Sequence, residues 1–142
     1  MTTQVPEEVS IKTESDIVAT RRTVREAASK LGFTQTDVAR IVTAASELAR
    51  NVFRYAGEGI MQWSTVEQQE RIAIELRFID HGPGIKDIQM ALREGYSTGG
   101  GLGMGLPGAK RLADELEIES VAGRGTIVTL RKWRCNGRDQ RD

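Results

Sequence analysis

Residues 97–106 read Ser-Thr-Gly-Gly-Gly-Leu-Gly-Met-Gly-Leu, and this stretch decides the fold. Five of the seven residues from Gly99 to Gly105 are glycine. Glycine loses more conformational freedom on folding than any other residue, so a purely structural loop rarely carries so many. The backbone N–H groups of such a loop, backed by a helix N-terminus, form a site for phosphate anions, and glycines also suit a lid that closes over a ligand. The stretch predicts a phosphate-facing lid, and a structural loop is the alternative.

Two better-known phosphate loops fit this stretch less well. A P-loop requires Gly-Lys-Ser/Thr after its glycines, and no such triplet follows here. Gly103, Gly105 and Gly108 have the spacing of the dinucleotide fingerprint. That fingerprint follows a strand directly in a βαβ unit, whereas the loop 94–101 precedes these glycines. We interpret the match as chance.

Hydrophobic periodicity and turn residues predict the elements around the lid. Before the lid we expect an extended segment at 9–12, helices at 13–31 and from 34 to the Gly57–Gly59 turn, and a hairpin of strands 60–66 and 71–79. A short helix follows at about 88–93. After the lid we expect a helix from Leu106–Pro107 to about 116 and a closing hairpin of strands 116–122 and 126–133. This order is typical of an α/β (α+β) two-layer sandwich with helices on one face of a mixed sheet. We assign residues 1–135 to one domain and expect 136–142 to be a disordered polar tail.

Composition narrows the classes of function. Apolar residues make up 39% of the chain, charged residues make up 28%, and the formal net charge is zero, whereas a nucleic-acid binder is normally basic. Cys135 is the only cysteine and His81 the only histidine, so neither an intrachain disulfide nor the usual zinc ligand set is available. A hydrolase triad is also disfavoured, because no serine nucleophile motif accompanies His81.

The first ten residues lack the charged start and apolar run of a signal peptide. No stretch approaches the ~20 apolar residues of a membrane span. From these two observations we expect a cytoplasmic protein that does not contact a membrane.

Three polar residues of the second predicted helix form a candidate reaction site. Glu47, Asn51 and Arg54 are spaced i, i+4 and i+7, on a face roughly opposite the apolar stripe 38–52. Mg²⁺ prefers oxygen ligands and keeps several waters, so the side-chain carbonyl of Asn51 plus phosphate oxygens can hold it. A carboxylate one turn earlier, Glu47, can take the proton of an attacking hydroxyl. A solvated helix face is the alternative interpretation.

A second candidate site follows the strand that ends near Ile79. The sequence Asp80-His-Gly82-Pro-Gly84 places a carboxylate at a strand end, where it can accept a hydrogen bond from an adenine amino group. Glycines after it let the backbone lie close to the base without a Cβ clash. A tight turn alone would explain the same residues. Gly125-Thr126, which opens the last strand, is by itself only a turn followed by a β-branched residue.

Taken together, these motifs resemble the N, G1, G2 and G3 boxes of the GHKL ATPase superfamily, which includes gyrase, Hsp90, histidine kinases and MutL. The resemblance implies a Bergerat ATP-binding fold, in which Asn51 holds Mg²⁺, Asp80 binds the adenine amino group, and Thr126 supports Asp80 and the base. It implies that the nucleotide contacts also include Arg54, Gly82, Gly84, Ile85, Thr98, Gly99, Gly100, Gly101, Leu102, Gly103, Met104, Gly105 and Leu106.

Within that superfamily, the segments 46–56 and 100–112 resemble the RsbT-type serine kinases of the stressosome, and the similarity extends from about Ser10 to Trp133. The resemblance implies phosphorylation of a STAS-domain protein with Glu47 as the base, then activation of a PP2C-type phosphatase or another output regulator. It leaves open whether the chain is a monomer or a homodimer.

One departure concerns charge. Residues 97–106 contain no Lys or Arg, so the γ-phosphate must be neutralised by Mg²⁺, by backbone amides, or by a cation such as Arg54, Lys110 or Arg111. Because this neutralisation is central to phosphoryl transfer, we expect slow turnover without a partner.

Three other functions compete with the kinase. One is a nucleotide-dependent binding switch with little catalysis, with which the lid without basic residues is compatible. Another is an anti-sigma factor that binds a sigma factor directly, since anti-sigma kinases share these boxes. The catalytic half of a histidine kinase is disfavoured, because the chain has no helix bearing a phospho-acceptor histidine.

Overall fold

The computed structural model of the chain describes residues 2–3, 7–84 and 102–134. The predicted short helix at about 88–93, the predicted site residues Ile85 and Thr98 to Gly101, and the predicted tail lie outside these ranges. For 102–105 only the backbone is described.

Strands form one twisted sheet with the order β1-β3-β4-β6-β5, and β2 pairs with β3 beside β1. Their bounds are β1 Thr2–Thr3, β2 Glu7–Ile11, β3 Gly59–Gln68, β4 Arg71–Asp80, β5 Glu115–Val121 and β6 Gly125–Trp133. Every described pairing is antiparallel, so the predicted mixed sheet is wrong in this detail. The reason is that hairpins make both β3–β4 and β5–β6, and β6 then runs back against β4.

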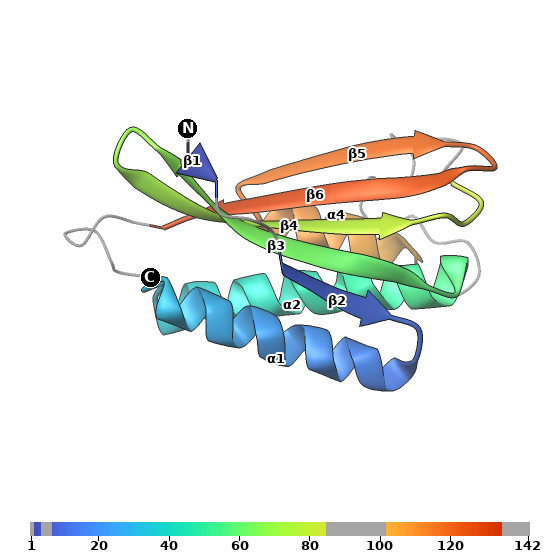
Figure 1. Ribbon diagram of the computed structural model, residues 1–142, viewed down its shortest axis with the longest axis horizontal. Helices are drawn as coiled ribbons and strands as arrows, with labels where there is room; N and C mark the ends of the chain where they lie inside the picture. The colour runs from blue at the N-terminus through green and yellow to red at the C-terminus, as the bar shows by residue number, and fades with distance from the viewer. Residues whose placement is uncertain (1, 4–6, 85–101, 135–142) are drawn as a thin grey trace.

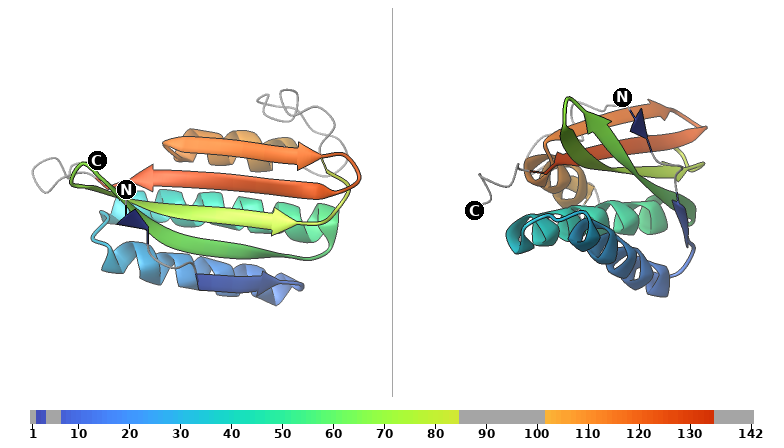
Figure 2. Two further views of the ribbon diagram at one scale, coloured as in Figure 1. Left: turned by 45° about the horizontal axis from the view of Figure 1, so that its top comes forward. Right: turned by 60° about the vertical axis from the view of Figure 1, so that its left-hand side comes forward.

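Helices α1 (Glu14–Lys30), α2 (Gln35–Asn51) and α4 (Leu102–Leu112) cover one face of the sheet. In the left view of Figure 2 the sheet stands in front of all three helices, and Figure 1 shows the same two layers from the side. The predicted two-layer α/β sandwich with helices on one face is therefore confirmed.

Both long helices begin at a threonine cap. The backbone N–H groups of Lys12 and Thr13 donate to the Asp16 carboxylate over 2.8 and 3.0 Å at the start of α1. These bonds lower the pKa of the Asp16 carboxyl below its ordinary value. The N–H of Asp37 donates to the Thr34 hydroxyl over 3.1 Å at the start of α2, which satisfies one of the free donors of that helix end.

Helix α2 does not continue as an α-helix to the Gly57 turn, as the sequence predicted. It passes after Asn51 into a π-helical turn, η1 (Val52–Ala56), which ends where the N–H of Gly57 donates to the carbonyl of Val52 over 3.1 Å. Such turns are uncommon and occur frequently at functional sites. This one carries Val52 and Tyr55 past the end of β4.

Helix α4 begins at Leu102, four residues earlier than predicted, and ends at Leu112, four residues earlier. The predicted lid residues 102–105 therefore belong to its first turn. Pro107 consequently lies inside the helix and not at its first position, and because proline has no N–H it removes one backbone hydrogen bond to the preceding turn.

The core lies between the two layers. Ile41, Ala45 and Leu48 of α2 are almost completely buried in one cluster with Leu76 and Phe78 of β4. Their spacing along α2 is the 3.6-residue period that the sequence showed. Among the described helices, none is long and apolar enough to cross a membrane.

Candidate functional site

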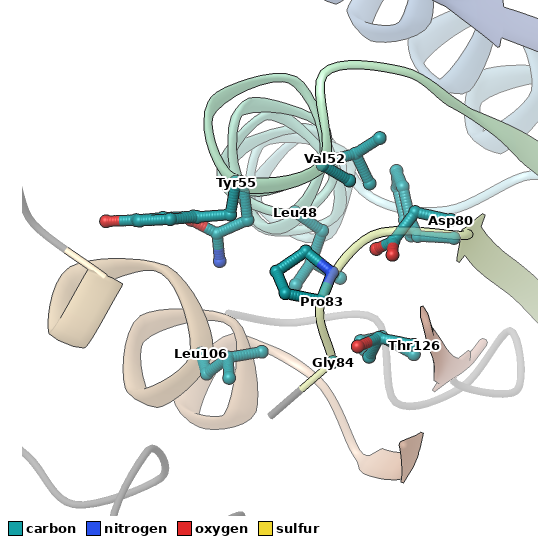
Figure 3. Close-up of a pocket in the computed structure, with 12 residues that line it drawn as sticks. Leu48, Val52, Tyr55, Asp80, Pro83, Gly84, Leu106 and Thr126 are labelled. Carbon is teal, nitrogen blue, oxygen red and sulfur yellow. The ribbon is translucent and has the colours of Figure 1, made fainter. Parts of the chain in front are cut away.

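A pocket opens between α2 and its π-helical turn, the end of β4, the start of β6, and α4 (Figure 3). Five of the predicted site residues line it: Asn51, Asp80, Gly84, Leu106 and Thr126. They come from four helices and strands and from the turn after β4, and the fold brings them together at one end of the sheet.

Asp80 and Thr126 are direct partners across β4 and β6. Residues paired in this way point to the same face of a sheet, and both line the pocket on the helix-covered face. Figure 3 shows the Asp80 carboxylate and the Thr126 hydroxyl directed toward the Pro83–Gly84 turn. An acceptor and a hydroxyl thus stand side by side at the pocket wall.

The turn after Asp80 holds the carboxylate in place. The backbone N–H of Gly82 donates to Asp80 Oδ1 over 2.9 Å, and the N–H of Gly123 donates to the Pro83 carbonyl over 2.8 Å. Gly84 has φ of +79°, and a Cβ there would lie 2.6 Å from the carbonyl oxygen of Val121. A residue with a side chain therefore fits poorly at position 84, whereas Gly82 supports the turn without lining the pocket.

Asn51 lines the pocket beside Leu48 and Val52, at the border of the apolar stripe. The sequence predicted that Asn51 lies opposite that stripe, and this prediction is wrong. Asn51 lies beside the stripe, because the pocket opens along one side of the buried face of α2. Asn51 Nδ2 and the Tyr55 hydroxyl are both buried and have no hydrogen-bond partner within the part of the chain that the structure describes. Buried polar groups are rarely left unpaired, so these two atoms indicate that a polar ligand belongs here.

Glu47 and Arg54 do not line the pocket. Glu47 Oε2 accepts a hydrogen bond from Arg50 Nη1 over 3.0 Å, and both side chains are partly exposed. The Glu47 carboxylate is therefore held on the solvent side of α2, one turn before Asn51, where a partner protein can approach it. Arg54 is exposed on the π-helical turn.

Several residues that line the pocket were missed as site residues. They are the apolar walls and the turn at its mouth: Leu48, Val52, Tyr55, Ala56, Phe78, Pro83 and Val128. The sequence placed most of them in helices and strands, where an apolar residue is indistinguishable from a core residue. The position of Tyr55 one turn after Asn51 was the available signal for a polar group on the same face.

The pocket fits a nucleotide bound through a metal ion. The apolar walls suit a flat base, the Asp80 carboxylate suits an amino donor, and the unpaired Asn51 amide is at hand for a hard cation or a phosphate oxygen. No cluster of three or more His, Cys, Asp or Glu side chains in the described ranges could hold a metal ion alone.

Comparison with known proteins agrees with this geometry. A model of the histidine kinase-like ATPase domain matches residues 11–132. The chain is 50% identical to the serine/threonine-protein kinase RsbT of Bacillus subtilis over 125 residues, which cover 88% of this chain and 94% of that protein. It is 34% identical to the anti-sigma F factor of Caldanaerobacter subterraneus over 119 residues, which cover 80% and 82%.

Among solved structures, the chain resembles the RsbU and RsbW domains of a Mycobacterium tuberculosis protein with a TM-score of 0.64 and 20% identity. The match covers 93% of this chain and 34% of that longer one, and it supports the fold.

The chain therefore belongs to the histidine kinase-like ATPase family, and this membership implies ATP binding. Within the family, its similarity to the RsbT-type serine/threonine-protein kinases covers most of the chain, which confirms the resemblance seen in the sequence.

Proposed function

We propose that this chain transfers the γ-phosphoryl group of Mg²⁺-bound ATP to a serine or threonine of a STAS-domain protein in the bacterial cytoplasm. The observation that carries the proposal is the pocket that combines Asp80, Thr126 and the unpaired amide of Asn51. The 50% identity to a serine/threonine-protein kinase supports the reaction type.

The pocket supplies binding and orientation. The adenine amino group donates to Asp80, while Phe78, Val128 and Leu106 enclose the base and exclude water. Because Gly82 holds the Asp80 carboxylate in a fixed position, little reorganisation is needed when the base arrives. The bound adenine ring then determines where the triphosphate lies relative to α2.

Asn51 is the residue that would hold Mg²⁺, through its side-chain oxygen. The amide nitrogen and oxygen exchange places by a rotation of the amide group, so the unpaired end of this side chain can present either atom. When bound, the ion neutralises charge on the phosphates, which is needed because residues 97–106 carry no cation.

Glu47 is the proposed base. The hydroxyl oxygen of the partner forms a bond to the γ-phosphorus as the bond from that phosphorus to the bridging oxygen breaks, ADP leaves, and the hydroxyl proton passes to the Glu47 carboxylate. Arg50 keeps this carboxylate oriented on the outer side of α2 through its 3.0 Å hydrogen bond. Arg54, Lys110 and Arg111 are the candidates for a cation near the γ-phosphate.

The proposal extends to partners. After phosphorylation of the STAS-domain protein, the chain is released to bind and activate a PP2C-type phosphatase or another output regulator. The similarity to RsbT supports this assignment. A sigma factor is the second candidate partner, because several relatives at 29–34% identity are anti-sigma F factors.

The test is a transfer assay with the purified chain, γ-labelled ATP, Mg²⁺ and the STAS-domain protein from the same cell. We expect acid-stable label on a serine or threonine of that protein, and no label when EDTA removes Mg²⁺. If no co-purifying protein became labelled, the proposed kinase activity would be contradicted. Co-purification with a sigma factor instead of a STAS-domain protein would favour the second candidate.

A further inference from the structure

Ser120 of β5, Thr126 of β6 and Asp80 of β4 form one row across three neighbouring strands. Asp80 pairs with Thr126, and Thr126 pairs with Ser120, so all three side chains lie on the helix-covered face. Asp80 and Thr126 line the pocket, whereas Ser120 lies behind Thr126 and does not. Ser120 can therefore act on a ligand through its contact with Thr126.

The hydrogen bonds of this row restrict where the hydroxyl hydrogens of Ser120 and Thr126 can point. Ser120 Oγ donates to the carbonyl oxygen of Gly125 over 3.2 Å and lies 3.1 Å from Thr126 Oγ1. A hydroxyl has a single hydrogen, so Ser120 cannot donate to both oxygens at once. The distance between the two hydroxyls allows either to be the donor; with the Ser120 hydrogen on the Gly125 carbonyl, Thr126 donates to Ser120 and its own hydrogen points away from the pocket.

This leaves only acceptors on the pocket side. Thr126 keeps lone pairs toward the ligand, and the Asp80 side chain presents acceptor oxygens, with Oδ1 held by the N–H of Gly82. Two adjacent acceptors match an amino group, which has two N–H donors. They repel a carbonyl oxygen at the same place, because an acceptor facing acceptors remains unpaired on burial.

We propose that Ser120 is a positioning residue that orients the Thr126 hydroxyl and so selects a 6-aminopurine over a 6-oxopurine. This inference rests on the proposed ATP site. Without the Ser120 hydroxyl, Thr126 is free to rotate and to donate to a 6-carbonyl group. The preference for a 6-aminopurine over a 6-oxopurine then falls, although Asp80 and the apolar walls of the pocket are unchanged.

The test compares affinities for Mg·ATP and Mg·ITP, whose base carries a carbonyl at position 6, by titration calorimetry on the full chain. We expect the wild type to prefer ATP and Ser120→Ala to lower the ATP/ITP affinity ratio about two- to tenfold, the range for one neutral hydrogen bond. Ser120→Thr, which keeps a hydroxyl, should retain the wild-type ratio. Thermal unfolding of each variant without nucleotide checks that the fold is retained.

A double-mutant cycle separates positioning from general support of the strand. Because Ser120 acts through Thr126, Ser120→Ala should not change the ratio when Thr126→Val is already present. An unchanged ratio in Ser120→Ala alone, or an equal loss of affinity for both nucleotides, would overturn the inference. If the wild type bound neither nucleotide, the ATP site itself would be wrong, which is a distinct result.

Discussion

Asn51 and Tyr55 lie one helical turn apart, and each buries a polar atom without a hydrogen-bond partner among the residues that the structure describes. Both line the same pocket, where α2 passes into the π-helical turn. Unpaired buried groups are costly, and a polar ligand that enters this pocket can pair these two atoms.

This relationship predicts the effect of Tyr55→Phe. An unpaired buried donor costs roughly 1–3 kcal/mol, so removal of the hydroxyl should raise the free energy of unfolding of the nucleotide-free protein by about 1 kcal/mol. Urea denaturation measures the change. A lower free energy of unfolding in the variant would mean that the Tyr55 hydroxyl is already paired in the free protein.

Gly84→Ala and Gly123→Ala form a matched pair. Both glycines have positive φ, +79° and +81°, so both alanine variants carry a similar backbone cost of about 1–2 kcal/mol. Only at Gly84 would the new Cβ meet the Val121 carbonyl, at 2.6 Å, whereas nothing lies within 4 Å at Gly123. Gly84→Ala should therefore destabilise by roughly 1–3 kcal/mol more than Gly123→Ala in thermal unfolding.

Nucleotide binding gives the same pair a second measurement. Because Gly84 lines the pocket and Gly123 does not, Gly84→Ala should weaken ATP binding, and Gly123→Ala should leave it near the wild-type value. Equal stability and equal affinity in the two variants would show that the close approach at Gly84 has no consequence.

Glu47→Gln tests the proposed base. The substitution keeps the shape of the side chain and removes its ability to take a proton, so phosphoryl transfer should fall by a factor of about 10²–10⁴. ATP affinity should change little, because Glu47 does not line the pocket. The matched control is Glu26→Gln, an exposed carboxylate on α1.

The same variant separates the kinase from the binding switch. If Glu47→Gln retained full transfer, the assigned base would be wrong. If it abolished transfer but still activated the downstream partner as well as the wild type, the binding and catalytic roles would be separable functions of the chain.

Asp16 predicts a pH dependence of stability. The N–H groups of Lys12 and Thr13 lower the pKa of this carboxyl in the folded chain below its ordinary value of 3.8. A lowered pKa means that the stabilisation is present above the unfolded value and is lost as pH falls toward the folded one. The difference in unfolding free energy between wild type and Asp16→Asn should thus be constant from about pH 5 to 7 and shrink below pH 3.8. If the difference in unfolding free energy between the two proteins did not shrink at low pH, the stabilising role of the Asp16 carboxylate at the start of α1 would be contradicted.

Much of the site was predictable from the sequence, because its polar members stand at element ends. Asp80 stands at the end of a clearly alternating strand, so its position was predictable without knowledge of the packing. Thr126 follows a glycine turn, and only the family resemblance gave it a role. Gly84 was predicted because a glycine lets the backbone lie close to the base, and the structure adds a second reason, the carbonyl oxygen of Val121 2.6 Å from where a Cβ would lie.

Other features depend on packing that no local pattern records. Phe78 and Val128 have the pattern of ordinary core residues in the sequence. They are pocket walls only because a pocket opens between α2, α4 and the strands that carry them. The π-helical turn at Val52–Ala56 and the early start of α4 at Leu102 both run against local preference. The glycines that predicted a loop at 102–105 lie in the first turn of α4 instead, although glycine is a poor helix former.

The most direct test of the account is calorimetric titration of the intact chain with Mg·ATP, in parallel with Asp80→Asn. We expect the wild type to bind one nucleotide per chain. Asp80→Asn should lose at least about tenfold in affinity, because its amide replaces a carboxylate acceptor with a partial donor, while it unfolds at nearly the same temperature without nucleotide. Absence of any saturable heat in the wild type at millimolar nucleotide would contradict the account.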